Sequence, residues 1–189
     1  MAATVTSRRY DGVSIALHWL TALLVLAAWL IGQTYKWFAP GSAPRAGTVA
    51  LHLWVGVAVL LVVALRLLWR ASLGRRMPPE EGGWMAIASH AGHVLLYALM
   101  IAVVGLGVVL TWLKGRSVPL WGLVGVAPPW GKDLALARTI YGLHSLAANT
   151  LGVVAAGHAL AALWHHYLLR DGVLRRMVPG LRLPFDPQS

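Results

Sequence analysis

Four long apolar segments constrain this chain more than any other feature of its sequence. A helix needs about 20 mostly apolar residues to cross the hydrocarbon core of a bilayer. Only 12% of the 189 residues are charged and 58% are hydrophobic, whereas a soluble protein carries charge on about a quarter of its residues. The sequence therefore predicts an all-α integral membrane protein, a single four-helix transmembrane bundle over residues 1–189. The expected spans are residues 13–31, 49–69, 87–113 and 139–169.

The basic residues indicate how the bundle is oriented. A net charge of +10 would suggest a nucleic-acid partner for a soluble chain. In a membrane protein, Lys and Arg gather instead in the short segments between spans and mark the cytoplasmic side. We therefore expect membrane lipid, and no nucleic acid, as a partner, with both termini in the cytoplasm. Ten of the 16 basic residues fall on that side: Arg8, Arg9, Arg66, Arg70, Arg75, Arg76, Arg170, Arg175, Arg176 and Arg182.

Six basic residues remain for the outer side of the membrane, where positive charge is normally sparse. Two interpretations stay open for them. Their long side chains either anchor the helix ends at the membrane interface or form an electropositive mouth for an anion. The six are Lys36, Arg45, Lys114, Arg116, Lys132 and Arg138.

The eight histidines are the main candidates for chemistry. The chain has no cysteine, which excludes disulfides, iron–sulfur clusters and thiolate ligands. Ionisable side chains inside a span are energetically costly and indicate function by default. Followed through the predicted topology, His18 and His158 lie at matching depth near the cytoplasmic side. His52 and His144 lie at matching depth near the outer side.

His144 and His158 share one face of the fourth span at two depths. They are 14 residues apart, which corresponds to ~21 Å of helical rise and nearly a whole number of turns. Imidazole nitrogens suit iron, and the core of a helix bundle is a place where such cofactors bind. Two facing histidine pairs therefore predict two stacked haems. The residue four positions after each paired histidine is small, which leaves room for a porphyrin: Ala22, Gly56, Ala148 and Ala162.

Histidines inside a span can also have two other roles. A single histidine in a span is commonly a hydrogen-bonded core residue, and clustered histidines can bind zinc. Tetrahedral zinc needs ligands that converge on one point, whereas these diverge to two depths. Four histidines that pair by depth favour haem over both alternatives.

Several motifs are shared with a known family. They are Leu17-His18-Trp19-Leu20, His52 with Gly56 and Arg66, His90-Ala91-Gly92-His93 with Tyr97, and then His144, His158, His165-His166-Tyr167 and Asp171. Over nearly the whole chain these residues resemble the prokaryotic cytochrome b561 family, in particular its small diheme superoxide oxidases. The resemblance implies a bacterial inner-membrane protein with two b-type haems. It implies His18 and His158 as ligands of the inner haem iron, and His52 and His144 as ligands of the outer one.

The resemblance also implies an oxidoreductase that passes electrons from periplasmic superoxide to ubiquinone. His165 matches the family's quinone-contacting position. It lies seven residues after His158, close to two helical turns and therefore on the same face. Histidine titrates near neutral pH, so it can donate a hydrogen bond and a proton to a quinone. Further candidates are His93 and His166 for the quinone pocket, and Lys114 and Arg116 for steering superoxide.

Alternatives to this function stay open. Related branches of the family accept electrons from a periplasmic dehydrogenase or hydrogenase, so the chain could connect a periplasmic donor protein to the quinone pool. A histidine-lined metal or proton carrier without haem is a third class. From the residues alone, His165 beside His166 is typical of a membrane-interface histidine, and His90 is a candidate for the same pocket or a haem edge. The resemblance does not specify superoxide entry residues within 115–132.

Overall fold

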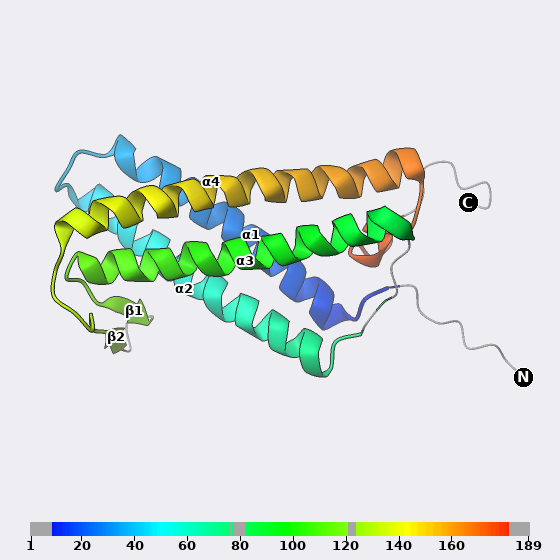
Figure 1. Cartoon of the computed structure of the whole chain (residues 1–189), viewed down its shortest axis with the longest axis horizontal. Helices are drawn as coiled ribbons and strands as arrows, with labels where there is room; N and C mark the ends of the chain where they lie inside the picture. The colour runs from blue at the N-terminus through cyan, green and yellow to red at the C-terminus, as the bar shows by residue number, and fades with distance from the viewer. Residues whose placement is uncertain (1–8, 76, 78–81, 121–123, 182–189) are drawn as a thin grey trace, which may run out of the picture.

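Four long helices form an elongated bundle in which each helix runs antiparallel to the next (Figure 1). The computed structural model describes residues 9–75, 77, 82–120 and 124–181. Each helix is long and apolar enough to cross a membrane, so the prediction of an all-α, four-helix transmembrane bundle is confirmed. The helices are α1 (Gly12–Thr34), α2 (Ala43–Ser72), α3 (Gly83–Leu113) and α4 (Leu134–Trp164).

The bundle has two different ends. At the terminal end, α1 begins and α4 finishes, and the chain continues through a π-helical turn (His165–Leu169) and a 3-10 turn (Leu174–Arg176). The opposite end, the loop end, carries a 3-10 turn (Tyr35–Trp37) and an antiparallel hairpin of β1 (Val118–Leu120) and β2 (Val124–Val126). The hairpin lies between the third and fourth spans, where the sequence predicted no strand.

Side-chain caps determine where three of the helices begin. Asp11 accepts the backbone N–H of Ser14 at 2.9 Å at the start of α1, and Ser42 caps α2. Asp133 accepts two backbone N–H groups at 2.9 Å at the start of α4. Such caps satisfy N–H groups that lack a partner inside the helix.

Two helices begin earlier than the sequence suggested. The second span was expected from residue 49, but α2 begins at Ala43. Pro44 is tolerated in the first turn because an N–H there would have no helical partner. The fourth span was expected from Thr139, whereas α4 begins at Leu134, directly after its Asp133 cap.

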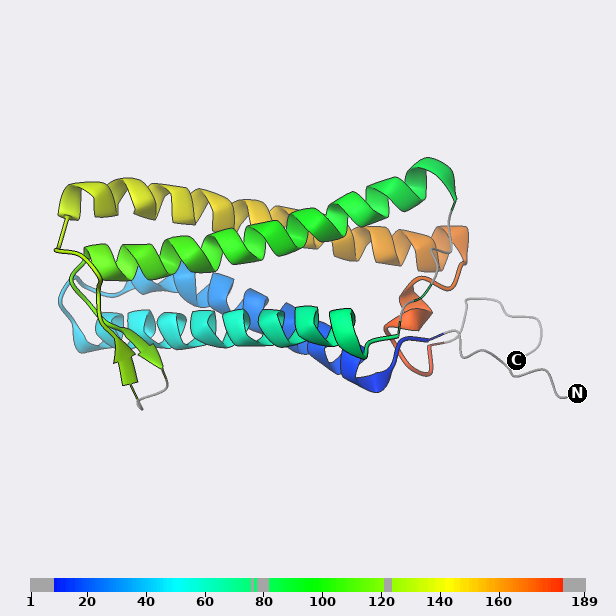
Figure 2. The ribbon, with the colours of Figure 1, turned by 60° about the horizontal axis from the view of Figure 1, so that its bottom comes forward.

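The helices pack as two hairpins, α1 on α2 and α3 on α4 (Figure 2). A small apolar cluster joins the hairpins, and it contains Val59, Val63, Met100 and Leu151. These residues lie along their helices between the two predicted histidine levels. Large apolar side chains elsewhere are mostly exposed, as expected for a surface that faces lipid rather than water.

The predicted location of two basic residues used for the orientation was wrong. Arg66 and Arg70 were counted among the basic residues between spans, but α2 continues to Ser72 and includes both. The apolar run resumes after each arginine, so the helix has no reason to stop before Gly74, where a Cβ would lie 3.0 Å from backbone atoms. Arg8, Arg76 and Arg182 lie outside the described residues.

Candidate functional site

The structure brings four histidines together as two pairs. The ring centres of His18 on α1 and His158 on α4 are 6.3 Å apart, with 65° between the ring planes. Those of His52 on α2 and His144 on α4 are 6.1 Å apart, with 85° between the planes. These are the pairs expected from depth, one towards the terminal end and one towards the loop end. All four side chains are partly buried.

Backbone carbonyls of neighbouring helices orient the loop-end pair. His52 Nδ1 donates to the carbonyl oxygen of Ala28 at 2.9 Å, and His144 Nδ1 donates to that of Val103 at 2.9 Å. A neutral imidazole carries one N–H, so this arrangement leaves Nε2 as the nitrogen with a lone pair. Donation from the far ring nitrogen to a carbonyl is the usual support of a metal-binding histidine.

Two glycines let these rings come close to the neighbouring helix. A Cβ on Gly32 would lie 3.1 Å from His52 Cε1, and a Cβ on Gly107 would lie 3.3 Å from His144 Cε1. Each glycine follows the accepting carbonyl by four residues. A larger side chain there would push the ring away from its carbonyl. The sequence did not predict the role of either glycine, because nothing local distinguishes them from the chain's other 18.

The spacing of both pairs suits two imidazoles on opposite sides of one metal ion. A metal–imidazole bond is about 2.0–2.1 Å long and the ring centre lies roughly 1.1 Å behind the nitrogen, so such rings would have centres about 6.3 Å apart. The observed 6.3 and 6.1 Å agree with this value. A Cβ on Gly56, one turn from His52, would meet no heavy atom within 4 Å. The donors and the room beside them therefore fit a bis-histidine haem.

The terminal-end pair has polar and charged neighbours. Arg66 donates to His18 Nδ1 at 3.0 Å, and its guanidinium lies 5.4 Å from the Tyr97 ring centre. His93 donates from Nδ1 to its own helix at Ser89, and its ring centre is 5.2 Å from that of His158. That spacing is shorter than the value of about 6.3 Å expected for two imidazoles on opposite sides of one metal ion. Among the described residues, Tyr97 Oη is buried and has no hydrogen-bond partner.

The histidines after α4 have different surroundings. His165 donates from Nδ1 to Asp171 at 2.5 Å, an interaction that the sequence did not suggest. His166 is buried, and its ring packs against Tyr167 with the centres 4.8 Å apart. His93 contacts His158 instead, and His90 is exposed. The quinone-pocket candidates are thus divided among separate environments.

The predicted steering residues, Lys114 and Arg116, lie exposed at the loop end after α3. Partial burial, followed by the nearby positive charge of Arg116, lowers the pKa of Lys114. Further cations gather at this end. Lys36 and Arg45 lie over the ring of Tyr35, whose hydroxyl meets that of Tyr141. The sequence did not predict this tyrosine pair.

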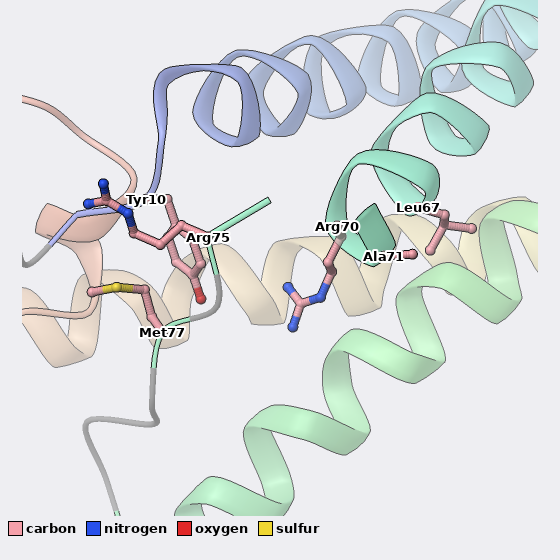
Figure 3. Close-up of a pocket in the computed structure, with 6 residues that line it drawn as sticks. All are labelled: Tyr10, Leu67, Arg70, Ala71, Arg75 and Met77. Atoms are coloured by element: carbon pink, nitrogen blue, oxygen red, sulfur yellow. The ribbon is translucent and has the colours of Figure 1, made fainter. Parts of the chain in front are cut away.

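A cavity of about 500 Å³ opens at the terminal end, outside both histidine pairs (Figure 3). Two arginines and a tyrosine give it a basic, polar lining, which suits an anionic group at the membrane interface. Its lining residues are Tyr10, Leu67, Arg70, Ala71, Arg75 and Met77.

A comparison of the chain with models of protein families matches residues 9–180 to the prokaryotic cytochrome b561 model. The chain belongs to the prokaryotic cytochrome b561 family. Similar proteins cover almost its whole length. They include a "Probable superoxide oxidase CybB" of Yersinia pestis, 33% identical over 182 residues that make up 93% of this chain and 98% of the relative.

Two other relatives carry more general names. "Cytochrome b561 homolog 2" of Escherichia coli is 29% identical and matches 94% of this chain and 95% of its own length. "Cytochrome b562" of Cereibacter sphaeroides is 33% identical and matches 89% and 94% respectively. This cytochrome is therefore a bacterial membrane protein of the oxidoreductase type that transfers electrons, and its family implies b-type haem.

Proposed function

We propose that this cytochrome oxidises superoxide on the periplasmic side of the bacterial inner membrane and reduces ubiquinone near the cytoplasmic side. One observation carries the proposal. Two imidazole pairs, each spaced for a metal ion, stand at two levels of a transmembrane bundle. Such an arrangement connects redox partners on opposite sides of a membrane. The name of the Yersinia pestis relative supports superoxide as the donor.

The four paired histidines would hold two b-type haems in the single domain that residues 1–189 form. His52 and His144 would ligate one iron, and His18 and His158 the other. When bound, haem iron accepts and releases one electron at a time, which is the chemistry that the pairs require. The Nδ1 hydrogen bonds of His52 and His144 would keep their Nε2 atoms in the form that binds iron.

Arg66 and Tyr97 would bind the acidic groups of the terminal-end haem. No carboxylate of the described residues pairs with Arg66, although the residue lies inside a span. An arginine there is costly without an anion. When His18 binds iron through Nε2, Nδ1 carries the ring proton and no longer accepts from Arg66. A haem propionate would then accept from Arg66 and from the unpartnered Tyr97 hydroxyl.

The terminal end would face the cytoplasm, because most arginines of the described chain lie there. The loop end would then face the periplasm, where Lys114 and Arg116 would attract superoxide. Each superoxide that gives up one electron leaves as neutral dioxygen. No bond of the anion breaks, and no proton is needed at this end.

Quinone reduction needs two electrons and two protons, so two superoxide ions supply one ubiquinone. His165 would donate a hydrogen bond and a proton to the quinone. Asp171 accepts the Nδ1 hydrogen of His165, which orients the ring and makes Nε2 the nitrogen that exchanges the proton. His93, which contacts His158, and His166, which packs against Tyr167, would remain further candidates for contact with the quinone.

One stopped-flow experiment tests the function. Superoxide is mixed with the oxidised protein, with and without a soluble ubiquinone, while haem absorbance is recorded. The proposal predicts fast haem reduction by superoxide and reoxidation only when quinone is present. Haems that superoxide leaves oxidised would rule out the donor, and reduced haems that quinone leaves reduced would rule out the acceptor.

A second candidate is an electron conduit that accepts electrons from a soluble periplasmic protein. The β-hairpin favours it, because the hairpin is fixed beside the basic loop end by a bond from Trp112 Nε1 to the carbonyl of Val126, 3.1 Å long. Such a surface would suit an acidic donor protein. In the experiment above, this candidate predicts no reduction by superoxide and rapid reduction by an acidic electron-transfer protein.

A metal or proton carrier without haem has less support. Within the described chain, no three or more histidine, cysteine, aspartate or glutamate side chains gather as ligands for one metal ion. Membership of a cytochrome family also speaks for haem. The absorbance spectrum of the purified protein separates this class from the other two.

A further inference from the structure

Two tyrosine hydroxyls meet at the loop end, one helical turn beyond the His52–His144 pair. Tyr35 Oη donates to Tyr141 Oη at 2.9 Å. Tyr35 lies three residues after Gly32, which packs against His52, and Tyr141 lies three residues before His144. Because three residues make nearly one helical turn, the tyrosine pair stands next to the loop-end histidines on the predicted periplasmic side.

Cations surround this tyrosine pair. The Lys36 ammonium lies 5.7 Å from the ring centre of Tyr141, and the Arg45 guanidinium lies 5.2 Å from that of Tyr35. Lys114 interacts electrostatically with both Tyr141 and His144. Three positive charges from three parts of the chain therefore act on the tyrosine pair and its surroundings at the loop end.

The hydrogen bonds of the pair leave one donor for a ligand. Tyr35 uses its hydroxyl hydrogen on Tyr141. A further polar neighbour of the Tyr141 hydroxyl is the Lys36 ammonium, which carries donors and no acceptor. The hydroxyl hydrogen of Tyr141 is therefore available to an acceptor from outside this cluster, and the surrounding cations favour a small anion.

We propose that Tyr141, held by Tyr35 and assisted by Lys36, binds superoxide directly at the entrance to the outer haem. This inference rests on the proposed function and adds the residues that contact the substrate. Tyr141 donates a charge-assisted hydrogen bond, which is stronger than a bond between neutral groups. Once the anion has given up one electron to the outer haem, it would be neutral dioxygen, which would accept a weaker hydrogen bond from Tyr141. The tyrosine keeps its proton, and the product leaves.

The test measures the rate constant for haem reduction by superoxide at several ionic strengths in the haem-loaded protein. Tyr141→Phe should lower the rate constant by about tenfold at every salt concentration, because a lost hydrogen bond to a charged group is not restored by salt. Tyr35→Phe should have a smaller effect, and the double variant should be no slower than Tyr141→Phe alone. Tyr10→Phe at the terminal end is the matched control.

Lys36→Gln separates binding from long-range attraction. It should reduce the dependence of the rate on ionic strength, since screening acts on charges, whereas Tyr141→Phe should leave that dependence unchanged. Nitrate serves as an inert probe, exchanged for methanesulfonate at constant ionic strength. It should compete with superoxide in the wild type and less in Tyr141→Phe.

The possible outcomes distinguish a failure of this inference from a failure of the proposed function on which it rests. If superoxide fails to reduce the wild-type haems, the proposed function is wrong and the inference with it. If superoxide reduces the wild type and both tyrosine variants equally fast, only the inference is overturned. Haem content is checked in each variant, and Tyr35→Phe carries the test if Tyr141→Phe loses a haem.

Discussion

His52 and His144 face each other with ring centres 6.1 Å apart, and each donates its Nδ1 hydrogen to a neighbouring helix. The same support occurs in both hairpins. A backbone carbonyl accepts the histidine's Nδ1 hydrogen, and the residue four positions after that carbonyl is a glycine. The donors and acceptors belong to different helices, so each histidine is oriented by helix packing and not by its own turn. The supports are Ala28 with Gly32, and Val103 with Gly107.

Gly32→Ala should displace His52 and weaken the loop-end haem. The added Cβ would lie 3.1 Å from His52 Cε1, and overpacking of this kind typically costs about 1–3 kcal/mol. Gly107→Ala should do the same through His144. We expect partial loss or an altered spectrum of one haem, measured by haem absorbance per protein. Gly142→Ala is the control, because its Cβ would meet nothing within 4 Å. Equal spectra in all three variants would contradict the role of the glycines.

Regular helix geometry explains what the sequence could predict. Rise and rotation per residue place His144 and His158 on one face at two levels, and the predicted pairs follow once the four spans alternate in direction. The glycine supports and the Tyr35–Tyr141 pair depend on which faces of two helices meet. Periodicity carries little information about that, since every face of these helices is apolar.

Local chemistry explains the errors at the ends of the helices. The second span was predicted to begin after Pro44, since proline breaks helices in their interior, but the first turn of α2 accepts Pro44. Asp171 was noted only as a shared motif residue. Its contact with His165 depends on Arg170, which adopts a left-handed conformation (φ 54°) and turns the chain back after the π-helical turn.

His165→Ala should slow quinone reduction by about one to two decades, since a lost hydrogen bond of ~1–3 kcal/mol corresponds to that range. Both haems should remain, and their reduction by superoxide should be unchanged. The outer histidines lie ~20 Å or more away along the helices. Asp171→Asn should have a smaller effect of the same kind, because the amide still holds the ring. Wild-type quinone reduction in His165→Ala would place the quinone elsewhere, and His93 and His166 would be tested next.

Lys114→Glu combined with Arg116→Glu should slow haem reduction by superoxide and remove much of its dependence on ionic strength. Steered association of an anion falls steeply with salt, and reversing two charges at the entrance removes the attraction. Arg70→Glu with Arg75→Glu makes the same change in net charge at the terminal end and should leave the rate unchanged. If the rate of haem reduction changes neither with salt nor with the loop-end substitutions, Lys114 and Arg116 do not steer superoxide.

Asp11 should stabilise the start of α1 only while its carboxyl is ionised. Partial burial raises its pKa, but bonds from Ser14, the Arg75 backbone and Trp69 outweigh this and hold the pKa well below its usual value. The stabilisation is therefore complete above the unfolded-state pKa, about 4, and is lost progressively as the pH falls from there through the lower folded-state pKa. Asp11→Ala should lower the unfolding free energy by about 1 kcal/mol at pH 7. Thermal unfolding of the wild type and of Asp11→Ala in detergent, at pH 7 and at pH 3, measures this effect. An equal difference in stability between the two proteins at both pH values would contradict the role of the ionised carboxyl.

Haem content of histidine variants tests the central claim most directly. The pyridine haemochrome assay should give two haems per chain for the wild type. His52→Ala and His144→Ala should each retain one haem with the spectrum of the terminal-end site, and His18→Ala and His158→Ala should retain the other. The exposed His90→Ala should retain both. A wild type with one haem, or a protein that loses a haem in His93→Ala and keeps it in His18→Ala, would contradict the pairing.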